Sequence, residues 1–212
     1  KQLLLAAGLP VPPYVLVRSG RPVPATVQDL GLPVFVKPAR GGSSIGITKV
    51  NNSSELHDAL AEAHRHDPKA LVEQAIAGRE IECGVLAGLE GTPEASTPAE
   101  IRVTGGQSFY DFEAKYLSDA TEFDIPPALP SSVLEQVRRL AVEAFTALDC
   151  EGLARVDFFV TGETVLVNEL NTMPGFTPAS MFPRMWAASG VSYADLVSRL
   201  IDDALRRGTG LR

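Results

Sequence analysis

The segment from residue 165 to residue 178, VLVNELNTMPGFTP, constrains the fold of this chain more than any other. It begins as an apolar run of the kind found in a buried strand. Glu169 and Asn171 follow at a spacing of two residues, which places both side chains on one face of a strand. The Met-Pro-Gly sequence after them ends that strand. Hard oxygen ligands at a strand end beside a glycine turn suit magnesium with a phosphate, although a capped strand with solvated polar residues also fits this segment alone.

A partner strand is expected directly before this segment. Residues 152–160, GLARVDFFV, have a strand pattern, and the Thr-Gly pair that follows predicts a tight hairpin. Arg155 and Asp157 share one face of the first strand, so the hairpin can bring them beside Glu169 and Asn171. Three oxygen ligands and an arginine are unfavourable to bury together unless a cation and an anion complete the cluster. A functional cluster is therefore favoured over a structural network of salt bridges.

Charge and cysteine content limit the class of protein. The chain of 212 residues has 45% hydrophobic and 21% charged residues, which predicts a soluble globular protein of one large or two small domains. Its net charge of -7 argues against nucleic-acid or membrane-surface binding, which needs a basic stripe. Cys83 and Cys150 lack metal-ligand spacing, so a reducing compartment, the cytoplasm, is expected. No apolar run reaches membrane-spanning length, and no signal peptide is expected.

A glycine-rich turn between two short strands is the main candidate for phosphate binding. Residues 32–37 and 47–50 have strand character, and the loop at residues 38–46, PARGGSSIG, lies between them. Glycine has no Cβ, so the backbone N–H groups of such a loop can approach a phosphate closely. Lys37, at the end of the first strand, would add a point charge. An ordinary hairpin turn is an equally good interpretation of this loop taken alone.

Two further strands are expected at residues 69–74 and 80–86, after a helix at residues 52–66 that a capping box begins. The short connection between these strands could hold an adenine edge, with a carboxylate just after it for the ribose. Glu73 and Glu80 could equally be edge-strand charges that prevent aggregation.

The second half of the chain is expected to contain another strand at residues 98–103 and a long loop at residues 105–118. That loop mixes aromatic and charged side chains. A loop of this length is more often functional than idle, although some of its aromatic side chains could simply cover the core. Three helices are expected at residues 132–148, 180–188 and 192–206, the first of them capped by Ser132.

Five segments in order resemble the D-alanine:D-alanine ligase branch of the ATP-grasp family. They are VFVKPARGGSSIGITKV, LVEQAIAGREIECGVL, YDFEAKYLSDATEF, LARVDFFV and VLVNELNTMPGFTPASMFP. The resemblance covers the central and C-terminal domains of that family, which is nearly the whole chain. It implies an α+β ATP-grasp fold in which two subdomains with antiparallel sheets clamp the nucleotide. The subdomains would be residues 1–74, with the phosphate flap, and residues 75–212, with the metal and substrate site.

The resemblance also implies roles for individual residues. Nucleotide binding would use Lys37, Ser43, Ser44, Gly46, Glu73, Gln74, Ile76, Glu80 and Lys115. Magnesium, or Mn²⁺ as an alternative ion, would be bound by Asp157, Glu169 and Asn171. Catalysis would depend on Arg155 and the Gly175 N–H at the tetrahedral intermediate, and on Ser43 and Tyr116. Substrate would contact Tyr110 and, at the carboxylate of the second amino acid, Ser180 and Met181.

The implied activity is the ATP-dependent joining of two D-alanine molecules through an acyl phosphate, for peptidoglycan precursor synthesis. The implied partners are ATP and D-alanine, with a homodimer for the full-length protein. The chain starts without methionine and lacks the family's N-terminal domain, so we expect a catalytic fragment with little activity alone. Two alternatives remain: a different ATP-grasp carboxylate-amine ligase, and a nucleotide-binding module without catalysis.

Overall fold

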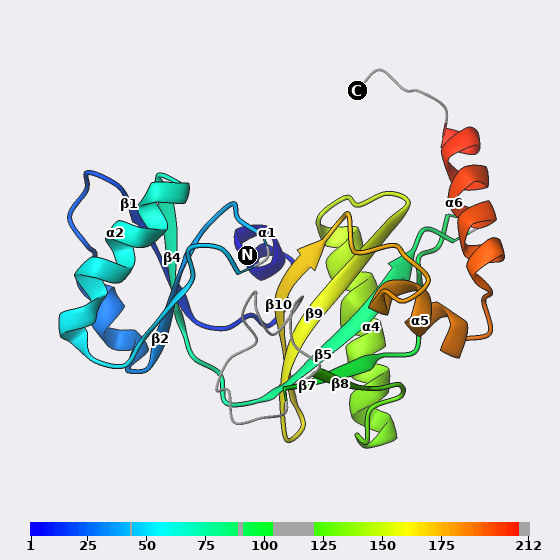
Figure 1. Cartoon of the computed structure of the whole chain (residues 1–212), viewed down its shortest axis with the longest axis horizontal. Helices are drawn as coiled ribbons and strands as arrows, with labels where there is room; N and C mark the ends of the chain where they lie inside the picture. Colours follow the sequence, from blue (N-terminus) through cyan, green and yellow to red (C-terminus); the bar gives the residue numbers. More distant parts are fainter. Residues whose placement is uncertain (43, 89–90, 104–120, 208–212) are drawn as a thin grey trace. The chain divides into compact units, whose positions relative to one another are not determined.

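The computed structural model describes residues 1–42, 44–88, 91–103 and 121–207, and the chain forms two compact units (Figure 1). Among the described residues, Pro12–Ala77 form the small unit, and Lys1–Val11, Gly78–Arg102 and the residues from Glu122 onward form the large unit. The chain thus passes from the small to the large unit after Ala77, close to the division expected after residue 74. The N-terminal residues belong to the large unit, whereas the sequence placed them with the small one.

The small unit is an antiparallel sheet with one α-helix and two short 3₁₀ helices. Its strands lie in the order β1-β4-β2-β3. They are β1 (Tyr14–Arg18), β2 (Val34–Pro38), β3 (Thr48–Val50) and β4 (Lys69–Gln74). The helices are η1 (Ala25–Leu30), η2 (Ser53–Glu55) and α2 (Leu56–His66), and α2 packs on β2 and β3. The predicted capping box between Asn52 and Glu55 is confirmed.

Strand periodicity explains the core of the small unit. Val34 and Val36 alternate with half-buried residues along β2, so one face of the strand is fully apolar. The same face receives Leu60 and Ala63, which lie one turn apart on α2. The resulting core is independent of that of the large unit.

The large unit contains a six-stranded antiparallel sheet in the order β10-β9-β5-β7-β8, with β6 paired to β5. Its strands are β5 (Arg79–Leu86), β6 (Glu94–Ala95), β7 (Ala99–Val103), β8 (Thr121–Asp124), β9 (Leu153–Thr161) and β10 (Thr164–Asn171). Its helices are α1 (Gln2–Ala6), α4 (Ser131–Ala147), α5 (Met181–Ala188) and α6 (Tyr193–Arg207). This architecture confirms the predicted α+β class with antiparallel sheets.

The two faces of this sheet are covered by different helices. The helix α4 packs on the face that carries Ile81, Cys83 and Val85 of β5, and together they form the main core (Figure 1). Because side chains alternate along a strand, Glu82, Gly84 and Leu86 point to the other face. The helix α5 covers only the Leu86 end of that second face. The polar residues farther along β5 and β9 are therefore not part of the main core.

The helix α4 begins one residue earlier than expected. Its N-cap is Pro130, with no side-chain hydrogen bond, so the predicted cap by Ser132 is wrong. Ser132 instead lies within the first turn. By contrast, the Ser192 hydroxyl does accept the Asp195 N–H at 3.1 Å at the start of α6. Among the residues described, no helix combines the length and the apolar content needed to span a membrane.

Candidate active site on the β9–β10 hairpin

A β-bulge in β10 determines where the predicted site residues point. Val165 and Val167 face Val160 and Phe158 and lie in the core. The register then shifts by one residue between Val167 and Glu169. Without this shift, Glu169 would point to the same face as the two valines, because side chains alternate with a period of two. The bulge turns it to the opposite face, as bulges beside active sites commonly do.

The N-terminal segment holds the bulge from the open edge of the sheet. The Val167 N–H donates to the Pro10 carbonyl at 2.8 Å, and the Lys1 ammonium donates to the Asn168 carbonyl at 3.0 Å. These bonds satisfy backbone groups that a bulge on an edge strand would otherwise leave to solvent. They also explain why the first residues of the chain belong to the large unit.

Beyond the bulge, the predicted residues form two rows across neighbouring strands. Asp157 lies opposite Glu169 on one side, and Arg155 lies opposite Asn171. On the other side Asp157 lies opposite Glu82 of β5. One row therefore contains three carboxylates, from Glu82, Asp157 and Glu169. The structure brings together all four residues that the sequence placed in this cluster, and adds a fifth.

Arg155 is the centre of the hydrogen bonds in this cluster. Its Nε donates to Asp157 Oδ1 at 2.7 Å and its Nη2 to Asp157 Oδ2 at 2.8 Å. The same Nε lies 3.2 Å from Glu82 Oε1. Asn171 Nδ2 donates to Asp157 Oδ2 at 3.0 Å. Both Asp157 oxygens are thus engaged, and the guanidinium lies between carboxylates of two adjacent strands.

The charge balance of this cluster favours a cation. Burial acts to lower the pKa of Arg155, but the charges of Asp157, Glu82 and Glu169 outweigh burial and raise it above its ordinary value. Arg155 therefore stays charged. Three carboxylates and one guanidinium leave a net charge of -2, and the carboxylates of Glu82 and Asp157 are mostly buried. A divalent cation would neutralise it, which lowers the free-energy cost of keeping these groups together.

The donor set fits magnesium. The described ranges contain no group of three or more His, Cys, Asp or Glu side chains arranged to hold a metal ion. Asp157, Glu169 and Asn171 offer two carboxylates and one amide, all of them hard oxygen donors. Magnesium commonly binds through one or two carboxylates together with substrate phosphates rather than in a complete protein cage. This set would be sufficient if a nucleotide supplied the remaining oxygens.

The turn after β10 leads to the predicted substrate residues. The Thr177 N–H donates to the Ser180 hydroxyl at 3.0 Å, and Ser180 is the N-cap residue of α5. Gly175 lies so close that a Cβ there would come 3.0 Å from Ser180 Oγ. Met181 is half-buried in the first turn of α5. Backbone and hydroxyl groups thus converge at the beginning of this helix.

Glu80 and Glu82 share the site-facing side of β5. Glu80 is half-buried and lies opposite Phe159, whereas Glu82 is only 5% exposed. Sequence reasoning chose Glu80 as a site residue and did not choose Glu82. The Glu-Ile-Glu alternation in the sequence could have identified Glu82, because it places Glu82 on the same strand face as Glu80. Only the strand order shows that Glu82 meets Arg155.

In the small unit, the predicted nucleotide residues lie on β2, β4 and the loops after them. Lys37 Nζ lies 3.1 Å from Glu73 Oε1, and both side chains are mostly buried. Gln74 and Ile76 are half-buried at the end of β4 and in the segment that follows. The ammonium of Lys37 is thus fixed beside the segment that was predicted to hold adenine.

The glycine-rich loop is anchored at its base. The Arg40 N–H and Nε donate to Asp67 Oδ2 at 2.9 and 2.8 Å, and Arg40 Nη2 donates to Asp67 Oδ1 at 2.9 Å. These bonds hold the pKa of Asp67 well below its usual range. At the tip, Ser44 and Gly46 adopt positive φ values of 59° and 72°. A Cβ at Gly46 would lie 2.5 Å from the His66 ring, so this close approach requires glycine.

Four predicted residues lie outside the described part of the chain: Ser43, Tyr110, Lys115 and Tyr116. Their roles stay predictions. The others divide between the units. Lys37, Ser44, Gly46, Glu73, Gln74 and Ile76 belong to the small unit, and Glu80, Arg155, Asp157, Glu169, Asn171, Gly175, Ser180 and Met181 belong to the large unit.

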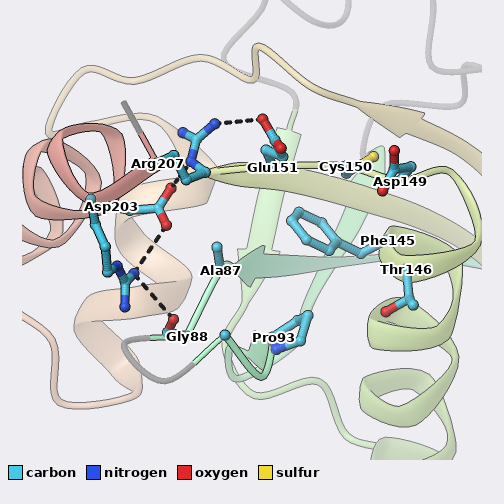
Figure 2. Close-up of a pocket in the computed structure, with 12 residues that line it drawn as sticks. Ala87, Gly88, Pro93, Phe145, Thr146, Asp149, Cys150, Glu151, Asp203 and Arg207 are labelled. Carbon is cyan, nitrogen blue, oxygen red and sulfur yellow. Dashed lines mark hydrogen bonds and ion pairs between the residues drawn. The ribbon is translucent and has the colours of Figure 1, made fainter. Parts of the chain in front are cut away.

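A cavity of about 630 Å³ elsewhere in the large unit contains none of the predicted residues (Figure 2). Four of its charged side chains, Glu151, Asp203, Arg206 and Arg207, form ion pairs with one another. Arg207 lies 2.6 Å from Glu151 and 2.7 Å from Asp203, and Arg206 lies 3.1 Å from Asp203. The cavity is therefore separate from the hairpin site.

Comparison with known proteins shows what this chain is similar to. A family model described as "D-ala D-ala ligase C-terminus" matches residues 3–202. A D-alanine--D-alanine ligase of Frankia casuarinae is 62% identical over 215 residues, which is 100% of this chain and 56% of the relative. The chain thus spans little more than half the length of that relative.

Two solved structures share the fold. The D-alanine-D-alanine ligase from Coxiella burnetii has a TM-score of 0.83 and 38% identity, over 97% of this chain and 55% of that one. The D-alanine--D-alanine ligase from Bacillus anthracis complexed with ATP has a TM-score of 0.81 and 27% identity, over 97% of this chain and 64% of that one.

Proposed function

This chain belongs to the D-ala D-ala ligase C-terminus family, and on that basis we propose that it is the ATP-binding and catalytic part of an enzyme that joins two D-alanine molecules. The observation that supports the proposal most is the cluster of Arg155, Asp157, Glu169 and Asn171, which the β10 bulge gathers on one face. A binding module without catalysis would not need all four.

In the proposed reaction, the γ-phosphoryl group of ATP moves to the carboxylate of the first D-alanine, and ADP leaves. The amine of the second D-alanine then attacks the acyl carbon of the resulting acyl phosphate. A tetrahedral intermediate forms, phosphate leaves as the amide bond is completed, and the amine loses a proton. Catalysis of this kind comes mainly from positioning and from neutralising the charge that develops on oxygen.

Asp157, Glu169 and Asn171 would hold magnesium together with the phosphates of ATP. A magnesium ion bound there would neutralise charge on the transferring phosphoryl group. Arg155 would donate to oxygens of the acyl phosphate and of the intermediate, since its guanidinium is rigidly held beside the predicted ligands. The Gly175 N–H would donate to the developing oxyanion, and Ser180 with Met181 would bind the carboxylate of the second D-alanine.

The small unit would bind the rest of ATP. Lys37 would contact the phosphates, and the loop with Ser43, Ser44 and Gly46 would close over them. The segment from Glu73 to Ile76 would receive adenine, and Glu80 the ribose. Tyr110, Lys115 and Tyr116 belong to the loop that is predicted to cover the substrates, and they would act from there.

We also propose that the full-length enzyme works as a homodimer in the cytoplasm. ATP and a reducing environment are found there, and both cysteines are free thiols in the structure. Sedimentation of the full-length protein would test the dimer.

The decisive experiment joins this chain to the N-terminal residues of the Frankia casuarinae relative and measures phosphate release from ATP. We expect release with D-alanine, and little with L-alanine or D-lactate. The chain alone should bind Mg-ATP but turn over slowly. Release with L-alanine and none with D-alanine would refute the substrate assignment. Ligase turnover by the chain alone at the rate of the joined protein would refute the expectation that the chain alone turns over slowly.

A further inference from the structure

We infer that Glu82 is a positioning residue that keeps the Arg155 guanidinium in place when Asp157 turns toward magnesium. The inference rests on the proposed function. Glu82 is not among the site residues that the sequence predicts, and its proposed role would allow one cluster to bind both a metal and an arginine.

The hydrogen bonds of Asp157 show why a second anion is needed. Both of its oxygens accept from Arg155, and Oδ2 also accepts from Asn171. A carboxylate oxygen that coordinates a cation has less electron density to share with a guanidinium, and the cation also repels that guanidinium. Metal binding at Asp157 therefore weakens the bonds that orient Arg155.

Glu82 is placed to compensate for that loss. It lies directly opposite Asp157 on the neighbouring strand, and its Oε1 is 3.2 Å from Arg155 Nε. Its side chain is only 7% exposed, so water screens this ion pair little. The rigid ladder between β5 and β9 fixes the distance between the two backbones. Glu82 can thus hold Arg155 from the side away from Glu169.

A purely structural salt bridge would place the same atoms at the same distances, so the test must separate the two roles. The matched control is Glu100, another buried glutamate on the adjacent strand β7, whose carboxylate pairs with Arg79. Glu100 lies opposite Ile81, on the core face of the sheet, away from the site. Glu82→Gln and Glu100→Gln make the same chemical change at a buried glutamate that pairs with an arginine, but on opposite faces of the sheet.

The first measurement uses the 212-residue chain without turnover. The Nε–H signal of Arg155 is assigned by nuclear magnetic resonance as the one lost in Arg155→Lys. We expect its hydrogen exchange to stay slow when Mg²⁺ and a non-hydrolysable ATP analogue are added. In Glu82→Gln the same addition should speed exchange about 10-fold or more, and in Glu100→Gln it should not.

The second measurement uses the chain joined to the N-terminal residues of its Frankia casuarinae relative. Misplacing a catalytic group by about 1 Å can cost about 100-fold in rate, so Glu82→Gln should lower kcat about 10- to 100-fold. The KM for ATP should change less than about 3-fold, because the ligands of the nucleotide are untouched. Glu82→Asp, which restores the charge, should recover part of kcat, and Glu100→Gln should leave kcat unchanged.

The inference would be overturned if the Arg155 Nε–H exchange and kcat were the same in Glu82→Gln and in the unsubstituted protein. A rise in the KM for ATP without a fall in kcat would also overturn it. A joined protein without any ligase turnover, or a chain that does not respond to Mg²⁺ and the analogue, would refute the proposed function itself and the inference with it. The two failures are distinguished by the behaviour of the unsubstituted protein.

Discussion

Gly84 is the point where the site-facing side of the sheet meets α5, and its replacement by alanine should separate them. A Cβ at Gly84 would lie 2.9 Å from Trp186 Nε1 and 3.1 Å from Phe182 Cε2. Both aromatic side chains are at most 2% exposed, so neither can move aside freely. We therefore expect α5 to be displaced by a few tenths of an ångström in Gly84→Ala.

The magnitude follows from two opposing effects. Overpacking a well-packed site costs about 1–3 kcal/mol. Replacing glycine within a strand by alanine recovers about 0.5–1 kcal/mol, because the unfolded chain loses conformational freedom. The free energy of unfolding of the large unit should fall by about 1–2 kcal/mol, which lowers the urea midpoint by about 0.5–1 M.

The assay is urea unfolding followed by the fluorescence of Trp186, the single tryptophan of the chain. Because that residue lies in the large unit, the signal reports this unit even if the two units unfold separately. Displacement of α5 should also move Ser180, its N-cap residue, and so raise the KM for the second D-alanine in the joined enzyme.

A double-mutant cycle tests the stated cause. Trp186→Phe removes the Nε1 atom that lies nearest to a Cβ at Gly84, and its unfolding is followed by circular dichroism. In this background Gly84→Ala should lower the free energy of unfolding by about 1 kcal/mol less than in the unsubstituted chain. An equal cost in both backgrounds, or a stabilised Gly84→Ala protein, would show that contact with Trp186 does not determine the packing here.

Three further predictions concern single groups. Glu169→Gln should weaken Mg-ATP binding by about 10-fold or more, as measured by calorimetry. The melting temperature should not change, because Glu169 is exposed. Normal Mg-ATP binding in this variant would show that Glu169 is not a metal ligand. Glu100→Gln should lower the free energy of unfolding by about 1–2 kcal/mol, because Arg79 loses the charge of a buried partner; an unchanged urea midpoint would contradict this. Burial raises the pKa of the Cys83 thiol from 9.0 to about 12, so the folded state keeps a proton that the unfolded state loses in this range. Through Cys83, stability should therefore fall by about 1.4 kcal/mol per pH unit between about pH 9 and 12, and stability should fall less steeply by this amount in Cys83→Ala.

The sequence predicted most of the secondary structure because the signals for it are local. The strands at residues 69–74 and 80–86 were expected from their apolar runs, and the structure places β4 and β5 within a residue of them. The capping box at Asn52 is likewise a short-range pattern and is confirmed. The start of α4 was misplaced because a serine within the first turn has the same local pattern as a true N-cap.

The sequence by itself also determined that Arg155, Asp157, Glu169 and Asn171 could meet, since a tight hairpin fixes which residues lie near one another. Tertiary structure alone decided on which face they meet. The alternation of β10 would place Glu169 with the core valines, and the bulge reverses this because Pro10 and Lys1, distant in the chain, bond to the backbone there. Strand order also decided that Glu82 joins Arg155. Periodicity is a property of one strand, whereas register and strand order depend on partners that no local pattern specifies.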